Sequence, residues 1–183
     1  MPIWPFLDLQ APEGKSLSDA YLDVYTETYV QAADGSPLQH QDWRGTTICF
    51  ERRKFGHAFS DSDDYRTHGG HAPELSLERA RRVLWIRAVL SGDVSGSNEI
   101  YLRRSAVRQD NRGRPVTRQV YLVPAELYIV VLDLRTNGTR RGEWFFHTAY
   151  ASDATYFHDR AMQEGVQLDV RRGQRKSPSL IGD

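Results

Sequence analysis

His57, Thr148 and Tyr150 are the residues of this chain whose types and spacing best suit chemistry on an anionic substrate. Thr148 and Tyr150 stand two apart in an apolar run, residues 143–151, that predicts a strand, so their side chains share one face of a sheet. A hydroxyl and a phenol in register can hold a phosphate or a ribose. His57 adds an imidazole, which exchanges protons near neutral pH, in a segment that also contains Lys54.

Cleavage of RNA without a metal ion needs a base for the 2′-hydroxyl proton, an acid for the departing 5′ oxygen, and cations or donors for the phosphorane charge. His57 suits proton transfer, while Thr148 and Tyr150 suit binding of the scissile phosphate. Each residue also has a structural alternative. A lone histidine is more often hydrogen-bonded within the fold, and threonine and tyrosine are ordinary strand residues.

Three cationic residues are predicted to bind the substrate: Lys54, Arg82 and Arg104. Arg82 lies near the middle of the best predicted helix, and Arg104 lies at the end of a predicted strand. Guanidinium groups are suited to phosphate because they are permanently charged, bidentate donors. Most of the other arginines are expected to be solvated surface charges.

A metal site is not expected. His68 and His71 stand three apart near Asp61, Asp63 and Asp64, but a Gly-Gly spacer in a polar loop offers little rigidity for the three or more ligands that zinc requires.

His147 and His158 are expected to be structural, and no cofactor is expected. Strand alternation predicts that His147 faces away from Thr148, and His158 falls in a predicted helix near the C-terminus. The chain has no Gly-x-Gly-x-x-Gly, Walker or Gly-x-Ser-x-Gly motif, which disfavours nucleotide-dependent and hydrolase-fold chemistry.

Composition is typical of one folded domain. The chain has 183 residues, 39% of them hydrophobic, and no apolar run approaches the roughly 18 residues of a membrane helix. The N-terminus lacks the pattern of a secretion signal, so we expect a cytoplasmic protein that does not bind a membrane. The single Cys49 is expected to be a small buried residue on a strand.

Charge is unevenly placed although the net charge is zero. Residues 1–50 carry a net charge of −5, and residues 101–183 carry a net charge of +5. The positive electrostatic potential of the second part of the chain would attract a polyanion. A solvated, arginine-rich surface is the alternative interpretation.

Periodicity predicts helices and strands in an α+β arrangement. The segment from residue 18 fits either a strand or a short helix capped by Ser16 or Ser18. A longer helix spans residues 77–90, and another spans 153–164. A first strand spans 46–50, and four more follow with short turns between them, which predicts N-terminal helical elements packed on a four-stranded antiparallel meander. The predicted strands cover residues 99–103, 117–123, 127–134 and 143–151.

The predicted domain organisation has three parts. Residues 1–45 form an N-terminal lead-in, 46–165 form the central domain, and 166–183 form a basic, disordered tail.

Four segments together resemble a known superfamily. They are FGHAF at 55–59, SLERARRVLWI at 76–86, YIVVL at 128–132 and FHTAY at 146–150. In this order they look like the phage-type branch of the barnase, EndoU, colicin and RelE (BECR) ribonuclease superfamily. The resemblance covers about residues 46–163. It implies a helix-plus-four-stranded-sheet fold and metal-independent RNA cleavage, with His57 matching the histidine after the first strand, and Thr148 and Tyr150 matching the closing strand motif.

The sequence therefore predicts an enzyme, a toxin-like endoribonuclease associated with a phage or prophage, that cleaves RNA by 2′-hydroxyl transesterification. Its expected partners are RNA, with transfer RNA as one candidate, and an immunity or phage protein. The alternative is a non-catalytic BECR-fold module that binds RNA or a phage or host protein, since a fold alone does not establish a reaction.

Overall fold

The structure is a computed structural model, which describes residues 2–60, 74–94, 98–105, 108–109, 113, 115–136 and 138–173. Asp61, Asp63, Asp64, His68 and His71 lie outside the described residues.

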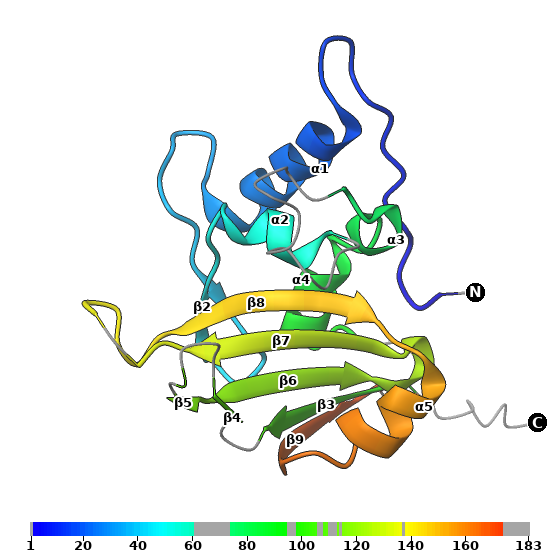
Figure 1. Cartoon of the computed structure of the whole chain (residues 1–183), viewed down its shortest axis with the longest axis vertical. Coiled ribbons are helices and arrows are strands. Elements are labelled where there is room, and N and C mark those ends of the chain that lie inside the picture. The colour runs from blue at the N-terminus through cyan, green and yellow to red at the C-terminus, as the bar shows by residue number, and fades with distance from the viewer. Residues whose placement is uncertain are drawn as a thin grey trace, which may run out of the picture.

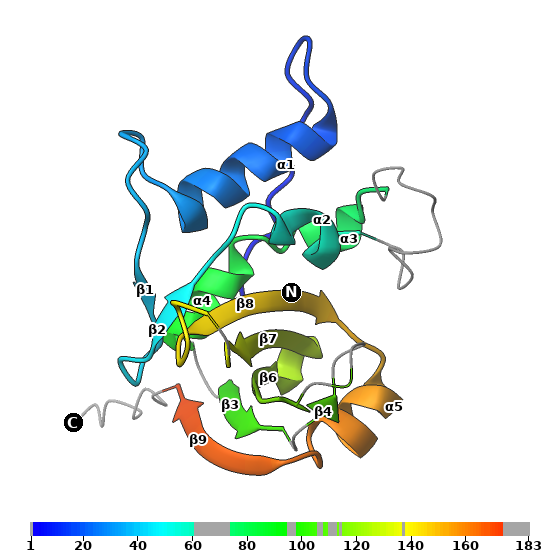
Figure 2. The same cartoon turned by 60° about the vertical axis from the view of Figure 1, so that its left-hand side comes forward.

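The described part of the chain is an α+β fold built on one curled, seven-stranded mixed sheet (Figures 1 and 2). The strand order is β1-β2-β8-β7-β6-β3-β9, and all neighbours are antiparallel except β2 and β8. A separate two-stranded ribbon pairs β4 (Arg108–Gln109) with β5 (Pro115–Val116). The strands of the main sheet are β1 (His40–Gln41), β2 (Thr47–Cys49), β3 (Glu99–Arg104), β6 (Arg118–Val123), β7 (Tyr128–Leu134), β8 (Trp144–Ala151) and β9 (Val166–Arg172).

The predicted α+β class is confirmed, but the sheet is larger than the predicted four-stranded meander. The four predicted strands correspond to β3, β6, β7 and β8, which are consecutive antiparallel neighbours. Strands β1 and β2 extend the sheet beyond β8, and β9 extends it beyond β3.

Strand β9 corrects the prediction that residues 166–183 form a disordered tail. Six of its seven residues pair antiparallel with β3, and Leu168 is the additional residue where the register shifts. Gly165 allows the chain to turn into this strand with φ +74°, and a Cβ atom there would stand 2.0 Å from the Arg104 carbonyl oxygen. The end of the chain, residues 174–183, lies outside the described residues.

Helices α1 to α4 lie on the side of β8, whereas α5 lies near β3 and β9 (Figure 1). The predicted capping of the first helix is confirmed, because Ser16 and Asp19 form a capping box. Two π-helical turns, Thr26–Val30 and Phe157–Ala161, continue the first and last helices. The helices are α1 (Leu17–Tyr25), α2 (Lys54–Ala58), α3 (Leu77–Ala80), α4 (Trp85–Ser91) and α5 (Ala154–Tyr156).

The helix predicted over residues 77–90 is interrupted between α3 and α4. The Tyr29 hydroxyl donates to the Val83 carbonyl at 2.7 Å and accepts from the Arg87 amide at 3.0 Å. In a continuous α-helix these two backbone groups would form a hydrogen bond with each other. Here the tyrosine hydroxyl lies between them and replaces that hydrogen bond with two of its own.

The N-terminal segment belongs to the main hydrophobic core. Trp4, Tyr21, Tyr25 and Tyr29 are buried, and the last two rings contact Phe50 from the segment after β2. Residues 1–45 therefore pack as part of the same unit as the predicted central domain. A smaller cluster lies on the other face of the sheet: Leu122, Ile129, Val131 and Phe157.

Asp42 joins the turn before β2 to the middle of the sheet. Its Oδ1 accepts hydrogen bonds from the amides of Arg44 and Thr46, and its Oδ2 accepts from the buried Tyr121 hydroxyl at 2.8 Å. Burial, together with the Asp42 carboxylate, raises the pKa of Tyr121, so the phenol remains a donor.

Asp42→Ala is expected to lower the free energy of unfolding by about 2–4 kcal/mol, because it leaves the Tyr121 hydroxyl buried without its acceptor. Asp34 is the matched control, since it caps the Ser36 amide in an exposed turn without a buried partner. Asp34→Ala should cost less than about 1 kcal/mol in urea unfolding. Equal losses in the two variants would contradict this role of Asp42.

Candidate functional site

A β-bulge in β8 places His147 on the site face of the sheet. Register with β7 shifts between Val131 and Leu132, so that Thr148 pairs with Val131 while Phe146 pairs with Leu132. His147 is the additional residue, and it lies on the same face as Thr148. The prediction that His147 faces away from Thr148 was wrong, because strict alternation does not hold across a bulge.

Helix α2 brings His57 to the same place. Strand β2 pairs with β8 only at Trp144 and Phe145, and the chain then leaves the sheet. Helix α2 follows and packs beside the part of β8 that β2 does not cover. Phe55 and Ala58 are buried and anchor this helix, while His57 is on its exposed side.

His57, His147, Asp133 and Arg118 form a chain of polar contacts. Nε2 of His57 lies 3.4 Å from Nε2 of His147, and the ring centroids are 4.9 Å apart. Nδ1 of His147 lies 2.8 Å from Oδ2 of Asp133, a close contact that is not aligned as an ideal hydrogen bond. Arg118 donates from Nε to Oδ1 of Asp133 at 2.8 Å, and its Nη2 lies 3.4 Å from His147 Nε2.

Packing and neighbouring charges keep the His57 imidazole neutral at pH 7. Desolvation is the largest cause, and His147, Lys54 and Arg79 add repulsion, which together lower the pKa of His57 to about 4. The residue as a whole nevertheless remains exposed to solvent. A neutral imidazole with an accessible nitrogen can accept a proton.

Asp133 is held as a carboxylate in spite of its burial. Desolvation acts to raise its pKa, but contacts with His147 and Arg118 outweigh it, so the pKa of Asp133 is lowered. A fixed carboxylate against Nδ1 sets the orientation of the His147 ring, in the way that acidic residues orient catalytic imidazoles.

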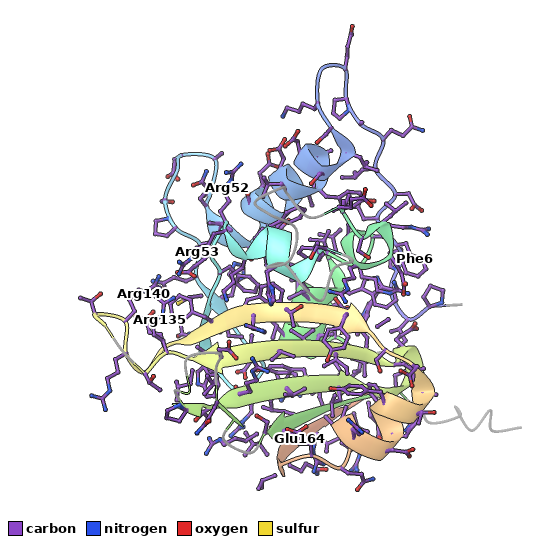
Figure 3. All side chains as sticks on the ribbon, viewed as in Figure 1. Phe6, Arg52, Arg53, Arg135, Arg140 and Glu164 are labelled. Atoms are coloured by element: carbon purple, nitrogen blue, oxygen red, sulfur yellow. The ribbon has the colours of Figure 1, made fainter. Side chains whose placement is uncertain are left out.

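His57 and Asp133 line an open pocket of about 410 Å³. Three cationic side chains, Arg53, Lys54 and Arg135, share its wall. Figure 3 shows Arg53 and Arg135 on the same side of the molecule as Arg52 and Arg140, beside the β7–β8 turn. The pocket therefore combines an acid–base group with a cationic rim.

Stacking and ion pairing hold two of these arginines. The Arg135 guanidinium lies 3.7 Å from the centre of the Phe145 ring, and Glu51 pairs with both Arg135 and Arg53. The Arg53 side chain is 74% exposed, so it remains accessible to a ligand.

The structure brings some of the predicted site residues together. His57 and Lys54 line the pocket. Thr148 follows His147 on the same face, and Tyr150 lies farther along β8, where Arg79 stands 5.7 Å over its ring. Burial and contact with Tyr156 raise the pKa of Tyr150, so its phenol stays protonated.

Arg82 and Arg104 lie elsewhere. Arg82 packs over Phe6 and Trp85 and donates to the Glu78 carbonyl. Arg104 is exposed and pairs with Gln119, and therefore points to the sheet face opposite Arg118. Neither lines the His57 pocket.

Sequence reasoning missed His147, Asp133, Arg118 and Arg53. Asp133 carried the clearest signal, since it is a carboxylate at the end of an otherwise apolar strand. Arg118 on β6 is the cross-strand partner of Asp133 on β7. This pair could not be predicted from the sequence because it depends on the register between the two strands.

Cys49 is half-buried rather than fully buried. Its thiol lies 3.2 Å from Glu143 Oε2 and 2.9 Å from Arg140 Nη2. Burial is the main cause that raises the pKa of this thiol to about 11, so it is not a ready nucleophile.

Among the described residues, no group of three or more His, Cys, Asp or Glu is arranged to hold a metal ion. No helix within the same ranges has the length and apolar character to cross a membrane.

Comparisons with protein-family models, curated proteins and solved structures found no match to this chain.

Titration of His57 tests the electrostatics of the site. We expect its imidazole to titrate near pH 4, and Lys54→Met to raise that pKa toward 6.5 by removing a nearby cation, while Lys54→Arg leaves it low. Because the folded pKa lies below the unfolded one, His57 disfavours folding increasingly as pH falls from 6.5 through 4, and has no such effect above that window. Imidazole proton NMR measures the pKa, and a midpoint at or above 6.5 in the unmodified protein would refute the description.

Proposed function

We propose that this chain is a metal-independent endoribonuclease that cleaves RNA by attack of the ribose 2′-hydroxyl on the adjacent phosphodiester. The observation that carries the proposal is the His57–His147 pair at 3.4 Å, with Asp133 behind it, at a pocket rimmed by cations. Two imidazoles and a phosphate-binding rim are what acid–base transesterification requires.

His57 acts as the base in this proposal. Its neutral imidazole takes the 2′-hydroxyl proton, since a pKa of about 4 keeps it unprotonated at physiological pH. His147, oriented by Asp133, gives a proton to the 5′ oxygen as the bond from phosphorus to that oxygen breaks and the bond to the 2′ oxygen forms. The two rings separate when RNA binds, because a 3.4 Å contact leaves no room for a phosphate between them.

Cations on the pocket rim stabilise the phosphorane charge. Lys54 and Arg135 flank the pocket, and Arg53 extends it toward solvent. Thr148 and Tyr150 keep the phosphate-positioning role proposed from sequence, as hydroxyl donors on the face that carries His147.

Assignment to the BECR superfamily, and with it a toxin-like role in phage biology, is part of the same proposal. It is supported by the order of the four sequence segments and by the antiparallel run β3, β6, β7 and β8 beside helices. The site residues added here, His147 and Asp133, lie on the last two strands of that run.

A non-catalytic RNA-binding module is the second candidate. The observation that favours it is the direct contact between the two imidazoles, which occupies the space that a scissile phosphate would need. In this case the cationic pocket binds RNA and no strand is cut.

Removal of either imidazole tests catalysis. His57→Ala and His147→Ala should each reduce RNA cleavage by about 10²–10⁴-fold in the presence of a chelator, because each removes one proton-transfer step. His158→Ala is the matched control, since His158 is exposed on the turn after α5, and it should cleave at the normal rate. Fragments should end in a 2′,3′-cyclic phosphate.

Intact RNA under all conditions, together with RNA binding, would support the binding module instead. Full activity in both histidine variants would remove the pair from the mechanism.

Arg53→Gln tests the cationic rim. RNA affinity should fall about three- to tenfold, and the slope of log K against log salt should decrease by about 0.7, because one phosphate contact is lost. Arg172 is the matched control, since it is also exposed and ion-paired but lies on β9, away from the pocket. An equal loss in Arg172→Gln would show that the effect is one of overall charge.

A further inference from the structure

A second cavity lies beside the His57 pocket on the same face of the sheet. It has a volume of about 70 Å³, and its floor is formed by Val120, Ile129 and Val131 of the central strands. Arg118 lines it and also contacts Asp133 and His147, so this arginine separates the two pockets. Glu164, labelled in Figure 3 beside β3 and α5, marks its far wall.

Ser105 supplies a buried polar group to the lining of this cavity. The residue is only 8% exposed, and its Oγ has no hydrogen-bond partner among the residues that the structure describes. Buried hydroxyls nearly always form a hydrogen bond. A buried hydroxyl that lacks one and lines a cavity therefore indicates a hydrogen bond to a bound ligand.

The remaining polar groups are fixed donors. Arg103 donates to the carbonyls of Glu164 and Gly165, and Arg118 donates to Asp133, which hold both guanidinium planes in place. Tyr150 and Tyr156 add two aromatic walls. An apolar floor, aromatic walls and donors at the edge suit a flat ring that carries carbonyl acceptors.

We propose that this cavity binds the pyrimidine base of the nucleotide whose phosphate occupies the His57 pocket. The choice of a ribonucleotide rests on the proposed function. The volume corresponds to roughly five to seven water molecules, which fits a single six-membered ring better than a two-ring purine. Ser105 bonds to the polar edge of the ring, and Arg118 lies between base and phosphate.

Calorimetric titration of the full chain with nucleotides tests the cavity. Uridine 3′-monophosphate should bind at least about tenfold more tightly than inorganic phosphate, and adenosine 3′-monophosphate no more tightly than phosphate. Val120→Phe fills the cavity and should abolish the advantage of the uridine nucleotide while leaving phosphate binding unchanged. Val166→Phe is the control, since this strand valine is 67% exposed on β9.

Ser105→Ala is the second variant, in case Val120→Phe does not fold. It should weaken uridine 3′-monophosphate binding about fivefold through loss of one hydrogen bond, with no change for phosphate. Equal affinity for the nucleotide and phosphate, or an unchanged advantage in both variants, would overturn the proposal. Adenosine 3′-monophosphate binding that Val120→Phe abolishes would overturn the pyrimidine assignment.

Cleavage assays separate this inference from the proposed function. His57→Ala should lose cleavage but keep the base-dependent affinity. Base-dependent binding in a protein that cleaves no RNA would leave the cavity assigned and the proposed reaction refuted. Cleavage without any base-dependent binding would overturn the inference alone.

Discussion

The register shift between β7 and β8 is the constraint on which the candidate site depends. Without the additional residue at His147, strand alternation would direct its ring into the helix-covered core instead of toward Asp133. The shift also leaves Thr148 and Tyr150 on the face that carries Arg118. One local irregularity of the backbone thus gathers groups from three strands on one face of the sheet.

The rest of the fold keeps this arrangement in place. Strand β2 ends early and leaves an uncovered stretch of β8, where α2 positions His57. Buried aromatic rings from the N-terminal segment, with Tyr25 at their centre, pack under α2 through Phe55 and Phe59. The Asp133 carboxylate is stabilised from two sides, by Arg118 and by His147. His57 is neutral at pH 7 because its pKa is lowered to about 4, and His147 lies next to it with its Nδ1 against the Asp133 carboxylate.

Much of the fold follows from local patterns, while the site depends on long-range contacts. Alternation and turn residues located β3, β6, β7 and β8 to within about two residues. The break between α3 and α4 depends on Tyr29, which lies more than fifty residues away in the sequence. Strand β9 was predicted to be part of a disordered tail because its composition is rich in charged residues. His57 was identified from its chemistry, but its partner His147 was assigned to the wrong face because no sequence rule reveals a bulge.

His57 and His147 are proposed to work as one unit, and a double-mutant cycle on the rate of RNA cleavage is the sharpest test of that proposal. Residues that act together in one step have strongly non-additive effects. The double variant His57→Ala, His147→Ala should cleave RNA no more slowly than the slower single variant. Losses that multiply in the double variant would show two independent contributions and would rule out a joint role for the two imidazoles.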